Sequence, residues 1–319
     1  MREKVLITAI GSASADAVIR NLSKVYDIIG TNIYPKEFVA TSVMVDVFYE
    51  VPIAKNTEKY VNEILEICKK EGCQYVIPLT DPEVDVLSQH RTVFAHEGIV
   101  ICISDEAVIS ICRNKRKCSQ LLLEKNICNC IPEIDVEKEK YEFPLVAKII
   151  NGRSSEGLEI FRDKMGFHQF VREKYSPDKY LVQPFIEGTI VTVDILRKEE
   201  ECIVTMREEI IRTENGLGLT VRVFDDPVIK DVCVKIANAL NIKGCVCFEF
   251  IRDNENRLWF LECNPRFSGG ISFSVIAGYN YPINHMKCFQ NKKIDRQDSI
   301  KKIYISRKYE EVITGEGKE

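Results

Sequence analysis

The sequence has no long apolar run, no C-x-x-C motif and only four histidines. No apolar stretch approaches the roughly 18 residues that a helix needs to cross a bilayer. The first residues, MREKVLITAIGSASADAV, have one short apolar strand followed by small polar residues, which is not typical of a signal peptide. The histidines are scattered, so no zinc-ligand pattern forms. These absences argue against a membrane protein or a zinc module and predict a cytoplasmic protein.

Strong charge of one sign is also missing. The 319 residues carry a formal net charge of −4, which gives no general attraction to nucleic acid or an anionic membrane, although it permits a local basic pocket. Thirteen cysteines are many, but their spacing matches no metal or redox motif. They are expected to be buried free thiols, which suits a reducing compartment.

The first hundred residues alternate short apolar strands with helical segments. Helices are expected at 15–22 and 58–71. Strands are expected at 5–10, 26–30, 45–51, 75–78 and 99–103. This alternation predicts a parallel, doubly wound sheet. The loop Gly11-Ser12-Ala13-Ser14 lacks the G-x-G-x-x-G fingerprint, so a scaffold whose strand-end loops face a substrate is favoured over a dinucleotide-binding domain.

The rest of the chain is rich in expected strands. These lie at 143–150, 158–161, 180–185, 190–196, 201–205, 220–224, 245–252 and 257–262, with helices at 105–123 and 227–240. Lys148 lies within the first of these strands, and a glycine- and serine-rich loop, residues 151–157, follows it. Backbone N–H groups of such a hairpin can wrap phosphates, although Gly-Ser hairpins are common and this one is not a Walker A loop. The basic cluster at 113–117 would by itself suggest a solvated helix face.

The strongest chemical signal comes from the last two expected strands, which form a hairpin with residues 253–256 as its loop. In that register Glu249 lies opposite Phe260, and Glu262 lies opposite Cys247. Glu249, Glu262 and Asn264 then project from one face, with the two glutamates at a diagonal separation of roughly 7–8 Å that long side chains can close onto a cation.

Two carboxylates and an amide oxygen form the hard, all-oxygen donor set that Mg²⁺ prefers. The competing interpretation is a pair of surface acids on an amphipathic strand. The neighbouring residues are apolar on both faces, and two glutamates in a buried sheet repel each other unless a cation offsets them. The metal interpretation is therefore favoured, in a register that a slip of one residue would change.

The run from Leu258 to Arg266, LWFLECNPR, resembles the E-x-N-P-R metal-binding strand of ATP-grasp enzymes, most closely the carbamoyl-phosphate-synthase-like branch and the amino-acid ligases. The resemblance extends from Val5 to about Phe289, with its motifs in the family's order. It implies an α/β ATP-grasp fold. A doubly wound parallel pre-ATP-grasp domain at 1–108 would precede two α+β sub-domains, at 109–187 and 188–319, that sandwich ATP.

Residue by residue, the resemblance implies an ATP site. Lys115 and Lys148 match the two lysines that reach the phosphates, although the family usually has Asp where this chain has Asn114. The loop that closes over the triphosphate corresponds to Arg153, Ser154, Ser155, Glu156 and Gly157. The hinge segment whose backbone holds adenine corresponds to Gln183, Pro184, Phe185 and Ile186, although an acid is commoner at the first of these positions.

The resemblance also implies the metal and catalytic groups. Glu249, Glu262 and Asn264 match the ligands of Mg²⁺ (or Mn²⁺). Arg266 matches the arginine that steadies the transferring phosphoryl group, which makes it a catalytic candidate together with Lys148. Arg207 is a further candidate as a second anion partner.

Two segments leave alternatives open. The family usually has a glutamate two residues beyond the hinge glycine to hold the ribose, and this chain has Ile190 there. Ile190, Thr192 and Asp194 are expected to share the strand face that looks toward the nucleotide. The segment PLTDPE at 78–83 follows a strand, where Thr80 or Asp81 could equally cap a helix or contact a substrate.

The implied activity is phosphorylation of a carboxylate by ATP, followed by displacement of phosphate by an amine. That chemistry needs positioning and charge stabilisation, and the sequence shows no Ser-His-Asp or Cys-His signature of a protein nucleophile. The alternatives are a carbamoyl-phosphate-synthase-like module acting on bicarbonate and a non-catalytic ATP-binding regulator. Expected partners are small-molecule carboxylates and amines, with no nucleic acid and no membrane, and a homodimer is left open.

Overall fold

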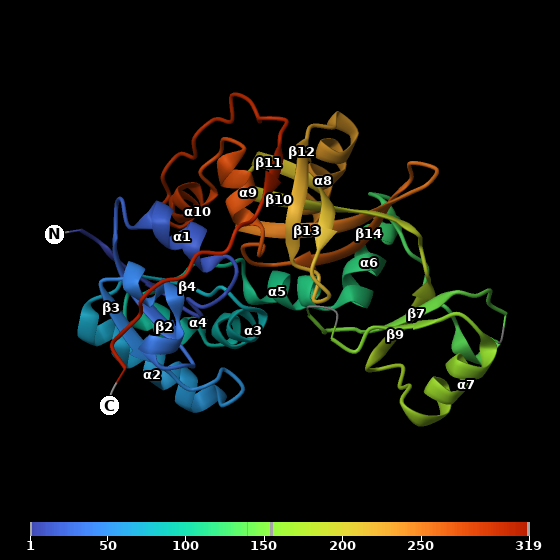
Figure 1. The fold of residues 1–319 in the computed structure, drawn as a ribbon, viewed down its shortest axis with the longest axis horizontal. Helices are drawn as coiled ribbons and strands as arrows, with labels where there is room; N and C mark the ends of the chain where they lie inside the picture. The colour runs from blue at the N-terminus through green and yellow to red at the C-terminus, as the bar shows by residue number, and fades with distance from the viewer. Residues whose placement is uncertain (1, 139, 154–155, 318–319) are drawn as a thin grey trace.

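The computed structural model describes residues 2–138, 140–153 and 156–317. Within them the chain forms three sheets of five, seven and three strands. Figure 1 shows the N-terminal sheet on the left, the large central sheet in the upper middle and the small sheet on the right. No helix in these described ranges is long and apolar enough to cross a membrane.

The N-terminal sheet is entirely parallel, with strand order β3-β2-β1-β4-β5. Its strands are β1 (Lys4–Ile7), β2 (Asp27–Asn32), β3 (Val47–Glu50), β4 (Tyr75–Ile77) and β5 (Val100–Ile101), with helices α1 (Ala15–Leu22), α2 (Thr57–Glu71), α3 (Asp81–Gln89) and α4 (Arg91–His96). Residues of both faces of β1 are fully buried, as a parallel strand covered on both sides requires. The predicted doubly wound sheet is confirmed.

The helix expected at 105–123 is two helices, α5 (Glu106–Arg113) and α6 (Lys115–Glu124). Asn114 breaks the run with an extended backbone conformation, and its side chain caps α6 by accepting the N–H of Lys117 at 3.0 Å. The break places Lys115 at the first position of α6, where its side chain is buried.

The small sheet is antiparallel, with order β8-β7-β9. Its strands are β7 (Leu145–Ile149), β8 (Glu159–Phe161) and β9 (Tyr180–Pro184), and α7 (Lys164–Glu173) covers one face. Phe167 and Phe170 of α7 pack edge-on or tilted against Phe161, which fixes the helix on the sheet. The other face is left for the central sheet.

The central sheet has order β15-β12-β11-β10-β13-β14-β6. Its strands are β6 (Asn129–Cys130), β10 (Gly188–Lys198), β11 (Glu201–Arg212), β12 (Gly218–Phe224), β13 (Gly244–Asp253), β14 (Leu258–Asn264) and β15 (Tyr304–Ser306). Val191, Val193 and Ile195 of β10 are fully buried in the core that includes α8 (Pro227–Ala239). Alternate residues of β10 therefore point to the opposite, polar face.

Two further helices, α9 (Ile271–Ile276) and α10 (Tyr281–Phe289), connect the central sheet to the N-terminal sheet. Phe267 and Tyr281 lie in one hydrophobic core with Val5 and Val18 of the N-terminal sheet and α1. Thirteen free cysteines occur in the chain, and eleven of them are buried. The expected domain limits at 108 and 187 stay predictions; β6 lies in the expected middle segment but joins the central sheet.

Candidate functional site

Glu249 of β13 lies directly opposite Glu262 of β14. The predicted register, with Glu249 opposite Phe260 and Glu262 opposite Cys247, is therefore wrong. Two one-residue shifts cause the difference. Next to the loop Arg252 pairs with Leu258, one residue later than predicted, and a bulge then places one extra residue of β14 between the Phe250–Phe260 and Glu249–Glu262 pairs. Asn264 lies opposite Cys247, so the three predicted metal ligands do share one face of the hairpin.

The electrostatics of the pair are asymmetric. Glu262 forms an ion pair with Lys115 Nζ at 3.0 Å and accepts a hydrogen bond from Asn264 Nδ2 at 2.9 Å. Among the described residues Glu249 has a single, longer ion pair, with Arg212 at 3.6 Å. Burial and then the charge of Glu262 raise the pKa of Glu249 to about 7. Burial would also raise the pKa of Glu262, but Lys115 and Asn264 hold it below its usual value. Two facing carboxylates of this kind favour a bound cation.

An inter-sheet cavity of about 350 Å³ lies between the small sheet and the central sheet. Much of its wall is apolar, including Val146, Ile160 and Ile251. Of the predicted ATP-site residues, it is lined by Lys115, Lys148, Arg153, Gln183, Pro184, Phe185 and Ile186, together with Glu249 and Glu262. Gly157 lies beside it with a positive φ of 63°, where a side chain would also collide with Ile149. Ser154 and Ser155 lie outside the described residues.

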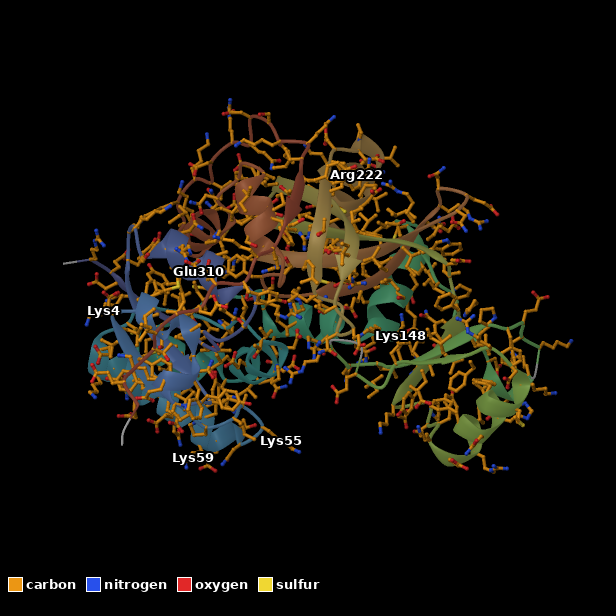
Figure 2. All side chains as sticks on the ribbon, viewed as in Figure 1. Lys4, Lys55, Lys59, Lys148, Arg222 and Glu310 are labelled. Carbon is orange, nitrogen blue, oxygen red and sulfur yellow. The ribbon has the colours of Figure 1, made fainter. Side chains whose placement is uncertain are left out.

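Two ammonium groups approach the carboxylate pair from this cavity. Lys148 lies near the end of β7, the middle strand of the small sheet, and lines the cavity. Figure 2 shows it where the small sheet meets the rest of the molecule. Burial, with a contribution from the charge of Lys115, lowers the pKa of Lys148 to about 8 against the opposing effect of Glu262. Lys115 Nζ also donates to the carbonyl oxygen of Gly152 at 2.7 Å. These lysines supply the positive charge that a polyphosphate would require.

Gln183 has a fixed orientation at the hinge. Its Nε2 donates to the carbonyl oxygen of Ile131 at 2.7 Å, while its buried Oε1 has no partner among the described residues. Because Gln183 also lines the inter-sheet cavity, this arrangement leaves a hydrogen-bond acceptor for a ligand.

A second cavity, of about 320 Å³, lies between the loops of the N-terminal sheet and the central sheet and is called here the N-terminal-side cavity. Ser12, Ser14, Thr80 and Asp81 line it from the N-terminal loops. The central sheet and its following loop contribute Thr192, Arg207, Glu209, Asn264, Arg266 and Ser268. The two cavities share Arg153, Arg212, Glu249 and Glu262, so the carboxylate pair stands at their junction.

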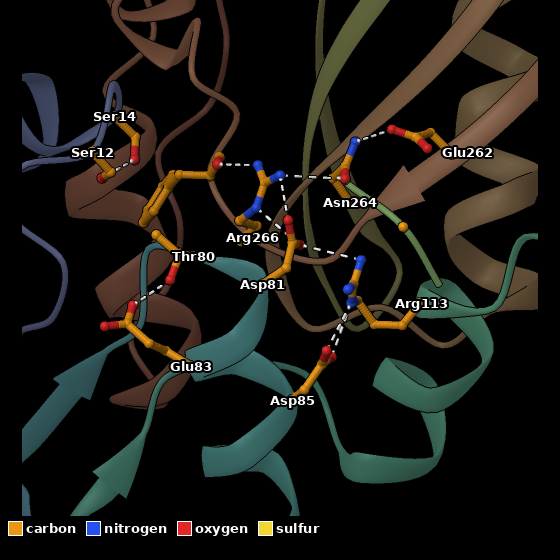
Figure 3. Close-up of polar contacts among 12 residues, drawn as sticks. Ser12, Ser14, Thr80, Asp81, Glu83, Asp85, Arg113, Glu262, Asn264 and Arg266 are labelled. Carbon is orange, nitrogen blue, oxygen red and sulfur yellow. Dashed lines mark hydrogen bonds and ion pairs between the residues drawn. The ribbon is translucent and has the colours of Figure 1, made fainter. Parts of the chain in front are cut away.

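Arg266 connects the N-terminal loops to this junction (Figure 3). Its Nε and Nη2 donate to the two oxygens of Asp81 at 3.0 and 2.8 Å, and Nη2 lies 3.4 Å from Asn264 Oδ1. Burial would raise the pKa of Asp81, but Arg266 and Arg113 lower it. Thr80 stands at the N-cap position of α3 and makes no capping bond. Asp81 thus orients Arg266, which neither sequence interpretation of the 78–83 segment anticipated.

Arg207 is held on three sides by protein groups. Its guanidinium donates to Asp194 at 2.7 Å, to Glu209 at 3.1 Å and to Ser268 Oγ at 3.2 Å. A direct contact of Arg207 with a transferring group stays a prediction. Arg207 lines the N-terminal-side cavity, and its three protein partners hold the guanidinium in place.

Sequence reasoning missed Glu209 and Arg212. Glu209 gives no functional signal in the sequence, because polar residues at alternate positions are ordinary in a strand. Arg212 lies beyond the expected end of that strand, whereas β11 runs to this residue. Among the described residues no group of three or more His, Cys, Asp or Glu side chains is arranged to hold a metal, so a metal here would depend on the carboxylate pair, Asn264 and ligand oxygens.

Two family models match the chain. Residues 5–102 match "PylC-like, N-terminal domain", and residues 176–311 match "ATP-grasp in the biosynthetic pathway with Ter operon". The matches cover the N-terminal sheet and most of the central sheet, including the strands of both glutamates.

Known proteins of several kinds are similar to the chain. The arginine-specific carbamoyl phosphate synthase large chain of Bacillus subtilis is 26% identical over 191 residues, which are 54% of this chain and 18% of that one. The biotin carboxylase domain dimer of Hydrogenobacter thermophilus 2-oxoglutarate carboxylase, in complex with MgADP, ADP and bicarbonate, has a TM-score of 0.74 at 18% identity, covering 95% of this chain and 73% of that chain. L-amino acid ligase from Bacillus licheniformis has a TM-score of 0.71 at 15% identity, covering 90% and 73%.

The chain spans less than a fifth of the length of the curated relatives that it matches. Its own architecture is nevertheless the expected one, with a parallel N-terminal sheet followed by two sheets that enclose a cavity. The predicted α/β ATP-grasp fold is confirmed, and the chain belongs to the ATP-grasp superfamily.

Proposed function

We propose that this protein is an ATP-dependent carboxylate–amine ligase, which forms an acyl phosphate and then an amide, releasing ADP and phosphate. The observation that carries the proposal is the position of Glu249 and Glu262 at the junction of two cavities. A phosphoryl group transferred at that junction would leave a nucleotide in one cavity and reach an acceptor in the other.

The inter-sheet cavity suits ATP. Its apolar walls fit a purine ring, and the hinge residues Gln183–Ile186 border them. Lys115 and Lys148 lie near the carboxylate pair, where they would neutralise phosphate charge and orient the triphosphate. Arg153 lines both cavities and would contact the phosphoryl group both before and after its transfer from donor to acceptor.

The donor set at the junction fits Mg²⁺ or Mn²⁺. Glu249, Glu262 and the amide oxygen of Asn264 are hard oxygen donors on one face, and burial together with the facing charge of Glu262 raises the pKa of Glu249. When bound, the ion would neutralise the negative charge that develops during phosphoryl transfer. Fewer than three carboxylates leave coordination positions for phosphate and water.

The acceptor would occupy the N-terminal-side cavity. Arg266, oriented by Asp81, lies beside Asn264 and would stabilise the phosphoryl group as it passes to the acceptor carboxylate. Phosphorylation gives the carboxylate a good leaving group, which an amine then displaces. Closure of the small sheet over the central sheet would keep water from the acyl phosphate.

A second candidate function is phosphorylation of bicarbonate, as in a carbamoyl-phosphate-synthase-like module. Two solved structural relatives contain bicarbonate. A cavity of about 320 Å³ is much larger than this anion of four non-hydrogen atoms, which favours a larger carboxylate. A homodimer and a cytoplasmic location stay predictions.

ADP release measured over a panel of carboxylates and amines tests the function. The ligase proposal requires ADP and phosphate formation that depends on one carboxylate and one amine. Turnover with bicarbonate alone would support the second candidate, whereas AMP as the nucleotide product would reject acyl-phosphate chemistry. Tight ATP binding without turnover on any substrate would support a regulatory protein.

A further inference from the structure

The N-terminal-side cavity contains a buried carboxylate for which the proposed chemistry has no role. The side chain of Glu209, on β11, is 4% exposed. Its Oε1 accepts the Arg207 Nε–H at 3.1 Å, while Oε2 has no hydrogen-bond partner in the described part of the chain. Folded proteins seldom leave such an oxygen unpaired. Glu209 lines the cavity together with Gly218, against whose backbone this buried oxygen packs.

The backbone around Glu209 is shaped to admit it. A Cβ atom at Gly218 would lie 1.9 Å from Glu209 Oε2, and a Cβ atom at Gly270 would lie 2.6 Å from Arg207 Nη2. The carboxylate and the guanidinium therefore occupy space that any other residue at these two positions would fill. The arrangement is a built site rather than a chance orientation of one side chain.

The charges next to Glu209 favour a hydrogen-bond donor. Arg207 is shared with Asp194, so the three buried groups carry a net charge of −1. Arg307 offsets part of this charge at longer range, but its N–H groups are directed to the carbonyl oxygens of Gly218 and Gly269. A carboxylate or phosphate would be repelled at Oε2, whereas an N–H group with positive charge would be attracted.

The location is close to the reaction centre. Arg207 pairs with Thr192 of β10, and Thr192 pairs with Glu249 of β13. Glu209 follows Arg207 by two residues and thus shares its face. Two inter-strand spacings, about 10 Å, separate β11 from β13, a span that one small substrate can bridge.

We propose that Glu209 is the recognition group for the amine substrate, with Oε2 accepting an N–H from a primary amine or ammonium group seated over Gly218. This inference rests on the proposed ligase function, which is what requires an amine. It assigns Glu209 a specificity role and gives Arg207 the task of holding the carboxylate in place.

Thermal unfolding of the full chain tests this proposed amine-binding position at Glu209 and Gly218, which is called here the amine seat. The probes are the twenty common L-amino acids, ethanolamine and methylammonium chloride, each with and without Mg–AMP-PNP. Tetramethylammonium chloride serves as a cation that has no N–H. We expect at least one primary amine to raise the melting temperature of the wild type, with tetramethylammonium giving no shift.

Two variants should remove that amine response by different routes. Glu209→Gln removes the charge, and Gly218→Ala keeps the charge but displaces the carboxylate. Each should weaken the apparent amine affinity at least thirtyfold while leaving the Mg–AMP-PNP shift unchanged. Glu214→Gln is the matched control, because Glu214 is an exposed acid in the same hairpin and is not part of the cavity wall.

The outcomes separate the two proposals. Wild-type amine binding that persists in Glu209→Gln, or the absence of any amine response in the wild type, would overturn the amine seat. A merely structural role would lower the unliganded melting temperature of Glu209→Gln without changing its amine affinity. Failure of Mg–AMP-PNP to bind would instead count against the proposed function, and the amine titrations without nucleotide would still decide the seat.

Discussion

Glu249 faces Glu262 across β13 and β14 because the strand pairing shifts by one residue immediately after Glu249. Without the bulge the register that pairs Phe250 with Phe260 would continue, so Glu249 would face Leu261 and the two carboxylates would lie on opposite faces of the hairpin. With the bulge, they are direct cross-strand neighbours. Like charges placed in this way destabilise a sheet unless a cation lies between them. In the proposed function, the bulge is the local distortion that brings the two candidate metal ligands opposite each other.

Glu262→Gln and Lys148→Ala should each reduce ADP formation at least a hundredfold, about 2.7 kcal/mol in the barrier. The first loses a metal ligand and the partner of Lys115; the second loses a phosphate-binding charge. Both should unfold at midpoints close to that of the wild type, because neither side chain belongs to a hydrophobic cluster. Turnover within about threefold of the wild type in either variant would show that its assigned role is wrong.

Lys148 should make nucleotide affinity depend on pH. Its pKa is lowered to about 8 by burial, so the ammonium is charged below pH 8 and becomes neutral as the pH rises through 8. At pH 9 only about a tenth of the free protein carries this charge, which predicts up to about tenfold weaker AMP-PNP binding than at pH 7. Lys148→Arg, which stays charged, should bind equally at both pH values. Calorimetric titration would check this, and a pH-independent wild type would contradict it.

The sequence predicted the architecture because its patterns are local. Apolar runs and helical spacing do not depend on distant parts of the chain, and the expected elements match the observed ones to within a few residues at most ends. The helix expected at 105–123 is an exception, because the capping bond of Asn114 outweighs the helical continuity around it. The bulge was also missed, since a one-residue shift leaves no trace in the alternation of short strands.

The candidate site was predictable only where a motif carried it. The E-x-N-P-R run led to Glu262, Asn264 and Arg266, whereas the partners of Arg266 depend on tertiary structure. Asp81 is 185 residues away in the chain from the arginine that it orients. The unpaired oxygen of Glu209 is equally invisible in sequence, because it results from two glycines in separate segments.

Gln183 should select the purine base. The bond to Ile131 fixes its amide, so Oε1 is left to accept the exocyclic amino group of adenine. The 6-oxo group of hypoxanthine would oppose that oxygen, and an unpaired buried polar group costs about 1–3 kcal/mol. We therefore expect ATP to exceed ITP by about five- to 150-fold in kcat/KM, with Gln183→Ala reducing the ratio. Equal use of ITP by the wild type would refute this role.

His285 should make stability sensitive to acid. Its Nδ1 accepts the Cys245 N–H at 2.9 Å, and its Nε2 lies 3.0 Å from the carbonyl oxygen of Cys102, which fixes the neutral ring. Burial lowers its pKa to about 4, below the value of about 6.5 in an unfolded chain. The unfolded state therefore binds more protons between these values, so stability is full above pH 6.5 and declines as the pH falls toward 4.

Urea unfolding at pH 7 and pH 5 measures that effect. Between these values the wild type should lose about 2 kcal/mol more unfolding free energy than His285→Gln, whose amide offers one donor and one acceptor without titrating. The difference between the two proteins cancels the contribution of the shared carboxyl groups. An equal loss in both proteins would show that the ring does not resist protonation.

The ribose contact is expected to be weak. Ile190 lines the inter-sheet cavity at the position where the resemblance implies a glutamate, and Thr192 lines the other cavity. Asp194 is fully buried against Arg207 and Ser274, so neither of the polar residues on this face of β10 is directed to a sugar in the inter-sheet cavity. A hydrogen bond to a charged group contributes about 1.5–3 kcal/mol. Without such a bond to the 2′-hydroxyl, the protein would discriminate little between ATP and 2′-deoxy-ATP.

We therefore expect 2′-deoxy-ATP to support ADP formation within about threefold of ATP, and Ile190→Glu to raise the preference for ATP by at least about tenfold. Ile190→Gln is the matched variant, because it adds a polar group of the same length without the charge and should give a smaller gain. Steady-state kinetics with both nucleotides would measure the three ratios. Arg212 is the one cationic side chain other than Arg153 and the two lysines that borders this cavity among the described residues. A wild-type preference for ATP above about thirtyfold, worth about 2 kcal/mol, would show that another side chain of this cavity holds the sugar, with Glu156, Glu187 and Arg212 as the candidates.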